Sequence, residues 1–208
     1  MHKLLPFVKF SCLAALAWAL FHFVYLGEWA TYKNSLVETC LSRGLSVPPE
    51  DVRIVVLSGE GVLKVYSGDV LLKSYDCAIG SGPPGTGVAK HSATPLGEYK
   101  IATRASRDDI FGSGPRRLVL DYPNDDDLDT AYEAGLVSQR EFEARADAIR
   151  AGLAAPELPG MGGPIAIVGN YFVFRGNRFT DGSIALANAD LVELYEVVPQ
   201  GTSVVIQR

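Results

Sequence analysis

The sequence predicts a mainly β domain with helical insertions, preceded by one N-terminal transmembrane helix. Short runs of β-branched and aromatic residues follow one another from residue 51, and turns containing Gly separate them. The 208 residues include 21 Gly and 12 Pro without a period, which is typical of a turn-rich fold. Residues 10–27 contain no Asp, Glu, Lys or Arg. An α-helix of that length nearly crosses the ~30 Å hydrocarbon layer of a bilayer.

The chain divides into four parts. Residues 1–9 are an N-terminal tail with two lysines, 10–27 a transmembrane anchor, 28–50 a linker, and 51–208 the globular domain. No small-residue cleavage site follows the apolar run, so an uncleaved anchor is the prediction and a cleaved signal peptide is the alternative. Aromatic residues gather in the second half of the run, where they would meet a membrane interface.

The strands are predicted from alternating apolar and β-branched runs that end at Gly, Pro or Asp. A Gly- and Pro-rich loop at 80–97 separates the first group from the rest, and it lacks the GK[ST] ending of a phosphate-binding loop. Residues 170–179 are a further strand or a hairpin. The other predicted strands cover 52–58, 61–67, 70–80, 98–105, 117–122, 164–169 and 202–208.

Helices are predicted at four places. A short helix lies within 28–50, before the Pro pair. Ser138 and Glu141 have the spacing of a capping box that opens a helix, and Gly152 is its expected end. Asn188 is the expected N-cap of a short helix before the last strand. The acidic stretch 121–129 lacks the spacing of a calcium loop, so we interpret it as the solvated N-terminus of a helix.

Composition excludes several classes of protein and site. The formal net charge is −5 with no cluster of Lys and Arg, which argues against a nucleic-acid partner. Three cysteines are too few for a disulfide scaffold or a Cys-rich zinc site, and no metal or cofactor is expected. Cys40 and Cys77 can pair if the domain lies outside the cytoplasm; alternatively, Cys77 is a core residue. His91 is the only histidine beyond residue 22.

Several motifs agree with one family in order and spacing. Residues 180–190 read TDGSIALANAD and lead into VPQGT, and TPLGEYKI begins at Thr94. Gly80 and Lys90 precede that run, YPN stands at 122–124, and PIAIVGN at 164–170. From residue 51 to 206 the chain resembles the YkuD-type L,D-transpeptidases. The resemblance implies a β-sandwich like the catalytic domain of that family, with the helical region 125–151 outside the sheet core.

The resemblance also implies a site with two substitutions. Members carry a nucleophilic Cys where this chain has Ser183, and an activating His where it has Val168. Gly182 is expected to let backbone N–H groups form an oxyanion hole. Asp181 and His91 are the candidates for a substitute base. The residues expected to bind substrate are Thr180, Asp181, Asn170 and His91.

These substitutions predict a domain without catalysis. A thiol is partly ionised at neutral pH, whereas a serine hydroxyl needs a positioned base, and a valine side chain has no lone pair. We therefore expect a bacterial cell-envelope protein, held by residues 10–27 in the inner membrane with its domain in the periplasm. Its cleft would bind peptidoglycan stem peptides or another envelope protein. The alternatives are a peptidoglycan acyl transferase that uses Ser183, and a structural protein with a vestigial cleft.

Overall fold

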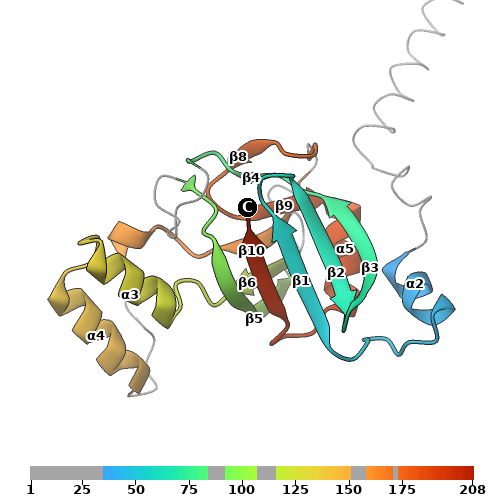
Figure 1. Ribbon diagram of the computed structural model, residues 1–208, viewed down its shortest axis with the longest axis horizontal. Coiled ribbons are helices and arrows are strands. Elements are labelled where there is room, and N and C mark those ends of the chain that lie inside the picture. Colours follow the sequence, from blue (N-terminus) through green and yellow to red (C-terminus); the bar gives the residue numbers. More distant parts are fainter. Residues whose placement is uncertain (1–34, 84–91, 107–115, 151–157, 171–172) are drawn as a thin grey trace, which may run out of the picture.

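The computed structural model describes residues 35–83, 92–106, 116–150, 158–170 and 173–208 (Figure 1). The predicted transmembrane helix at 10–27 lies outside these residues, as do His91, Lys90 and Gly152. None of the helices in the described ranges has the length and apolarity needed to cross a membrane.

Eight strands form one mixed sheet, in the order β3-β2-β1-β10-β5-β6-β7-β9, and two short strands, β4 and β8, form a second sheet. β1 pairs in parallel with β10, and β7 with β9, whereas the other pairs of the large sheet are antiparallel. The mainly β fold is therefore confirmed. The strands are β1 (Val52–Leu57), β2 (Val62–Ser67), β3 (Val70–Asp76), β4 (Ile79–Gly80), β5 (Gly97–Ser106), β6 (Arg116–Leu120), β7 (Ala166–Asn170), β8 (Arg178–Thr180), β9 (Ile184–Ala187) and β10 (Ser203–Gln207).

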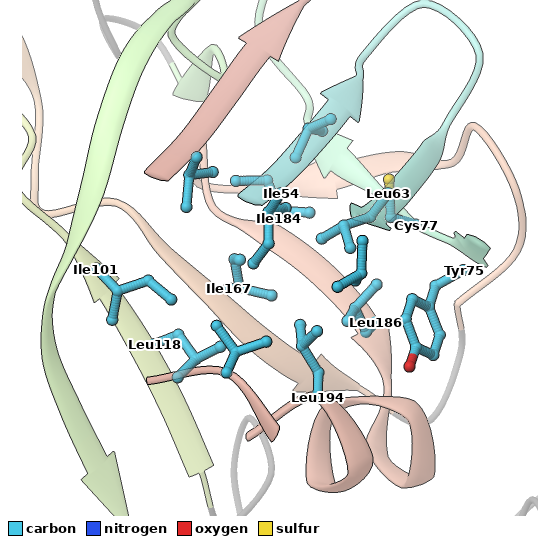
Figure 2. Packing of buried hydrophobic residues seen from close by; sticks show 14 of the residues in the cluster. Ile54, Leu63, Tyr75, Cys77, Ile101, Leu118, Ile167, Ile184, Leu186 and Leu194 are labelled. Carbon is cyan, nitrogen blue, oxygen red and sulfur yellow. The ribbon is translucent and has the colours of Figure 1, made fainter. Parts of the chain in front are cut away.

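The main core lies between the sheet and helix α5 (Asn188–Val197), which packs on β6, β7 and β9. Ile167 and Ile184 are fully buried there, and Leu194 of α5 points into the same space (Figure 2). Burying each such side chain contributes ~1.5–3 kcal/mol. Because successive residues of a strand face opposite sides, Val168 and Ala185 lie on the other face of β7 and β9. Packing of the main core thus determines which residues of β7 and β9 face the opposite side of the sheet.

Helix α2 (Leu36–Ser42) begins with a capping box, in which Ser35 Oγ accepts from the N–H of Glu38 at 3.0 Å. Its Leu36 and Cys40 are fully buried in the main core. The described part of the region predicted as a linker therefore packs on the domain.

Helices α3 (Asp125–Glu133) and α4 (Gln139–Arg150) lie together at one side of the large sheet, around a separate small core (Figure 1). The capping box predicted from Ser138 and Glu141 is present: Ser138 N–H donates to Glu141 Oε2 at 2.9 Å. A third short helix of the insertion, η3 (Pro159–Met161), is of the 3-10 type.

Two details of the predicted helices are wrong. The acidic stretch begins a helix with Asp125 and Asp126 exposed, as predicted, but Asp127 is buried, and Tyr99 Oη donates to its Oδ1 at 3.0 Å. Asn188 is not an N-cap: it is the first residue of α5, and its Oδ1 is buried against Gly169 without a hydrogen-bond partner in the described residues. The cap position is Ala187, which makes no side-chain bond.

Candidate functional site

Neighbouring strands bring the two substituted positions together. Val168 on β7 pairs with Ala185 on β9, and Ser183 stands two residues before Ala185. Residues two apart in an extended segment point to the same side, so Ser183 and Val168 share the face opposite the main core. Both line two cavities of about 230 and 210 Å³. The structure therefore places side by side the positions at which the resemblance implies a nucleophile and a base.

The floor of the site is apolar. Ala78, Ala166, Val168 and Ala185, which we call the apolar strip, form a buried cluster separate from the main core. Val119 on β6 packs against it, opposite Ala166. Such a floor offers van der Waals contact to a ligand and no proton-accepting group.

Ser183 is 6% exposed. Its Oγ accepts a hydrogen bond from the Ala166 N–H at 3.4 Å, which is its only one within the described ranges. Asp181 lines both cavities, yet its Oδ1 accepts from the backbone N–H of Ser183, at 3.3 Å. Within the described residues the Asp181 carboxylate is therefore bound to the backbone of Ser183 and not to its hydroxyl.

Position 182 requires a glycine because of its backbone conformation and its close neighbours. Its φ is +118°, and an added Cβ would lie 2.8 Å from the Ala93 carbonyl oxygen and 2.9 Å from Ile165 Cδ1. Its N–H donates to Thr180 Oγ1 at 3.3 Å. The backbone N–H groups of residues 182 and 183, expected to face an oxyanion, are thus both engaged by neighbouring side chains. They would have to exchange these partners to bind an anion.

The other predicted positions fall into two groups. Thr180 and Asn170 line the larger cavity with Phe179, so the structure brings them to the site. Thr94 lines neither cavity; its Oγ1 accepts from the Gly80 N–H at 2.7 Å. Because Gly80 pairs with Thr180, this bond joins the segment before β5 to the strand that carries Thr180. His91 lies outside the described residues.

The described cysteines are no substitute nucleophiles. Cys77 and Cys40 are free thiols buried in the main core, which fits the interpretation of Cys77 as a core residue. Burial, with a smaller effect of the Asp76 charge, raises the pKa of Cys77 to about 12. A thiol with that pKa is protonated at neutral pH and does not attack a carbonyl.

Arg117 is a site residue that the sequence did not reveal. It pairs with Val168 across β6 and β7, and it lines both cavities. An Arg in a β-strand is usually a solvated surface residue, and only the register of β6 against β7 shows that this one borders the cleft. The alternating pattern of the strand predicts on which face of the sheet Arg117 lies, but not that this face borders the cleft.

The comparisons with known proteins agree with this architecture. The chain matches the family described as YkuD, L,D-transpeptidase catalytic domain, over residues 51–206. Among solved structures it is similar to Bdellovibrio bacteriovorus Bd1075, with a TM-score of 0.51 and 17% identity over 76% of this chain and 48% of that one. A search of curated proteins finds no match.

Two further structures are similar with lower scores. L,D-transpeptidase 3 from Mycobacterium tuberculosis, solved with a faropenem-derived adduct, has a TM-score of 0.48 and 11% identity over 77% of this chain and 61% of that one. An L,D-transpeptidase mutant from Enterococcus faecium has a TM-score of 0.46 and 13% identity over 76% and 50%. The chain spans about half the length of Bd1075 and of the Enterococcus faecium enzyme. Because the family match covers three quarters of the sequence, the chain belongs to the YkuD family of L,D-transpeptidase catalytic domains.

Proposed function

We propose that this protein binds peptidoglycan stem peptides in its cleft without catalysing transpeptidation. The family relates the domain to peptidoglycan. The observation that supports the loss of catalysis is that Ser183 and Val168 line the same two cavities. A hydroxyl stands at the nucleophile position, and the neighbouring side chain cannot accept its proton.

The expected loss of rate is large. Removing a general base typically costs ~10²–10⁴-fold. Replacing a thiol by a hydroxyl adds to this, because the hydroxyl holds its proton at neutral pH. What remains is a cleft with an apolar floor and polar walls, which suits binding of a peptide and not its cleavage.

Incubation of the purified full-length protein with tetrapeptide muropeptides tests this function. Intact-mass analysis reports an acyl-enzyme, chromatography reports product, and a titration of the same muropeptides reports binding. We expect binding with neither adduct nor product. Absence of binding in the titration would contradict the proposal and would favour a vestigial cleft or an envelope protein as partner.

A second candidate is a serine acyl transferase, favoured by the presence of Asp181 beside Ser183 in both cavities. In that reaction Ser183 Oγ would form an ester with the stem carbonyl while the amide to the terminal D-Ala breaks, and the hydroxyl proton would pass through the base to the leaving amine. Turnover that disappears in Ser183→Ala would establish this candidate.

The anchoring of the protein is the remaining part of the proposal. The uncharged run 10–27 would hold it in the bacterial inner membrane with the domain in the periplasm. Fractionation of cells followed by protease treatment of spheroplasts tests this arrangement. We expect the full-length protein in the membrane fraction and digestion of the domain from outside. A soluble mature form that begins near residues 28–35 would show cleavage instead.

A further inference from the structure

Arg117 is the basic residue common to both described cavities, and the mechanism implied by the family motif does not use it. It stands in β6 opposite Val168, and its solvent-exposed side chain lines the two cavities above the apolar strip. Asp181 lies in the walls of the same two cavities. In the described residues the cleft therefore combines a basic side chain, an acidic side chain and an apolar floor.

From this arrangement we infer that Arg117 recognises a free carboxylate at the C-terminal end of the bound peptide. This inference rests on the proposed function and names the chemical group that the cleft selects. The planar guanidinium presents donors in a fork that matches the two oxygens of a carboxylate. Because Arg117 is exposed to solvent, dissolved salt screens such a bond, so its contribution depends on ionic strength.

The size and charge of the cavities determine how the peptide would lie. Volumes of about 230 and 210 Å³ are below the usual range for sites of drug-sized ligands, so they fit the end of a peptide and not a long stretch of it. The Asp181 carboxylate repels a second anion on the side of Ser183. The carboxylate of the ligand is therefore directed to Arg117, and its apolar side chain covers Ala166 and Val168.

The test compares two ligands and four forms of the full-length protein. The ligands are a tetrapeptide stem that ends in D-Ala and the same peptide with a C-terminal carboxamide. The proteins are the wild type, Arg117→Gln, Arg117→Lys and the matched control Arg116→Gln. Arg116 is the preceding residue of β6 and bonds to Val192 and Glu196 of α5, away from the cavities. Calorimetric titration gives each Kd.

We expect the wild type to bind the carboxylate form about tenfold or more tightly than the amide, with a preference that falls as salt increases. Arg117→Gln should reduce this ratio to near one, Arg117→Lys should retain part of it, and Arg116→Gln should retain all of it. Equal binding of both ligands by the wild type would overturn the inference while the proposed function stands. A ratio lost in Arg116→Gln to the same extent as in Arg117→Gln would also overturn it.

Binding of neither ligand would refute the proposed function together with the inference. Thermal melts establish that each variant is folded. If Arg117→Gln does not fold, the comparison of the two ligands on the wild type and on Arg117→Lys still decides between the outcomes.

Discussion

At the scale of single residues, the site combines a constrained backbone with Ser183 and Val168 at the positions where the resemblance implies a nucleophile and a base. Gly182 has the positive φ and the close contacts that exclude any side chain. Val168 lines the same two cavities as Ser183, and its side chain packs within the apolar strip. Placing a Cys at 183 and a His at 168 therefore tests whether the surrounding backbone supports L,D-transpeptidation.

Ser183→Cys alone is expected to restore little or no L,D-transpeptidase activity, because the thiol lacks a base and a charge that stabilises its thiolate. Ser183→Cys combined with Val168→His should exceed the sum of the single variants, since nucleophile and base act as a unit. We expect the rate of the double variant to exceed that of Ser183→Cys by about tenfold to hundredfold. This recovers part of the ~10²–10⁴-fold rate enhancement that a general base typically provides. Product formation from tetrapeptide muropeptides measures it.

The recovery is partial because the larger imidazole must find room among side chains packed around valine. Val168→His alone serves as the control for an effect of the histidine on binding. Additive single effects, or wild-type turnover, would contradict this explanation of the site.

The two core thiols provide a separate prediction. Burial raises the pKa of Cys40, and that of Cys77 to about 12, so neither reacts as a thiolate at pH 8. Native protein treated with iodoacetamide should remain unlabelled at both positions, and denatured protein should be labelled at both without a reductant. Peptide mass spectrometry distinguishes them from Cys12. Labelling that requires prior reduction would instead demonstrate a disulfide.

At the scale of elements, a partly buried ion pair joins helix α2 to the sheet and to α5. Lys73 Nζ on β3 lies 2.7 Å from Glu193 Oε1 on α5, and the Leu36 N–H at the start of α2 donates to the same carboxylate. The two charged side chains are only 12% and 17% exposed. One carboxylate thus stabilises three elements that are distant in sequence.

Glu193→Gln should lower the free energy of unfolding by about 3 kcal/mol, because it removes the charge of the carboxylate that lies 2.7 Å from the partly buried Lys73 ammonium. Glu196→Gln is the matched control on the same helix: its carboxylate is 56% exposed and pairs with Arg116, so a loss below about 1 kcal/mol is expected. Urea denaturation measures both. Equal losses would show that burial of the pair is not the cause.

The helical insertion is joined to the sheet by a buried carboxyl. Burial, more than the nearby acidic charges, raises the pKa of Asp127 above its ordinary value of 3.8, although Asn124 N–H and Tyr99 Oη donate to it. The folded protein therefore retains this proton at a pH where the unfolded chain has released it. The contribution to stability falls as pH rises from about the unfolded value through the folded one.

Wild type and Asp127→Asn should therefore differ in their pH dependence. As pH falls from 7 to 4, the wild type should gain stability relative to the variant, which has no proton to bind at this position. Chemical denaturation of both proteins at intervals across that range measures the difference. A difference that stays constant with pH would show that Asp127 titrates alike in the folded and unfolded chains.

Local signals predicted most of the elements, and long-range contacts decided the rest. The strands and the capping box of Ser138 depend on residues close in sequence, so their positions could be predicted. The burial of Leu36 depends on α5, more than 150 positions later, and its segment was interpreted as a linker. Arg117 was missed for the same reason, since its place in the cleft depends on Val168 in another strand. The hydrogen bond from the Gly182 N–H depends on the rotamer of Thr180, which no sequence motif predicts.

At the scale of the whole molecule, the first and last strands of the domain are neighbours inside the large sheet. β1 and β10 pair in parallel from Arg53 with Ser203 to Leu57 with Gln207, and β10 also pairs with β5. Among the described strands, β10 is the one that connects the β3-β2-β1 part of this sheet to β5 and the strands beyond it. An isolated bridge between Ala78 and Ala185 of β9 is a second connection.

A chain that ends at Gly201 should lose cooperative unfolding. Removal of β10 leaves β1 and β5 each with an unpaired edge, and it exposes the core side chains that Val204 and Ile206 contact. A chain that lacks only Arg208, which follows β10, is the control and should unfold as the wild type does. Circular dichroism during urea denaturation compares the two. A cooperative transition in the shorter chain would mean that the halves associate without this strand.

The position of β10 also affects the order in which the strand pairs of the large sheet can form. While the polypeptide is being made, β1 is synthesised before the other described strands of the large sheet, yet its parallel neighbour β10 is the last of them. The hairpins can form early, but β1 and β5 are joined only after β10 has been made, and pairs so distant in sequence close slowly. Until then β1 and β5 each present a free strand edge, to which a second unfinished copy of the chain can pair.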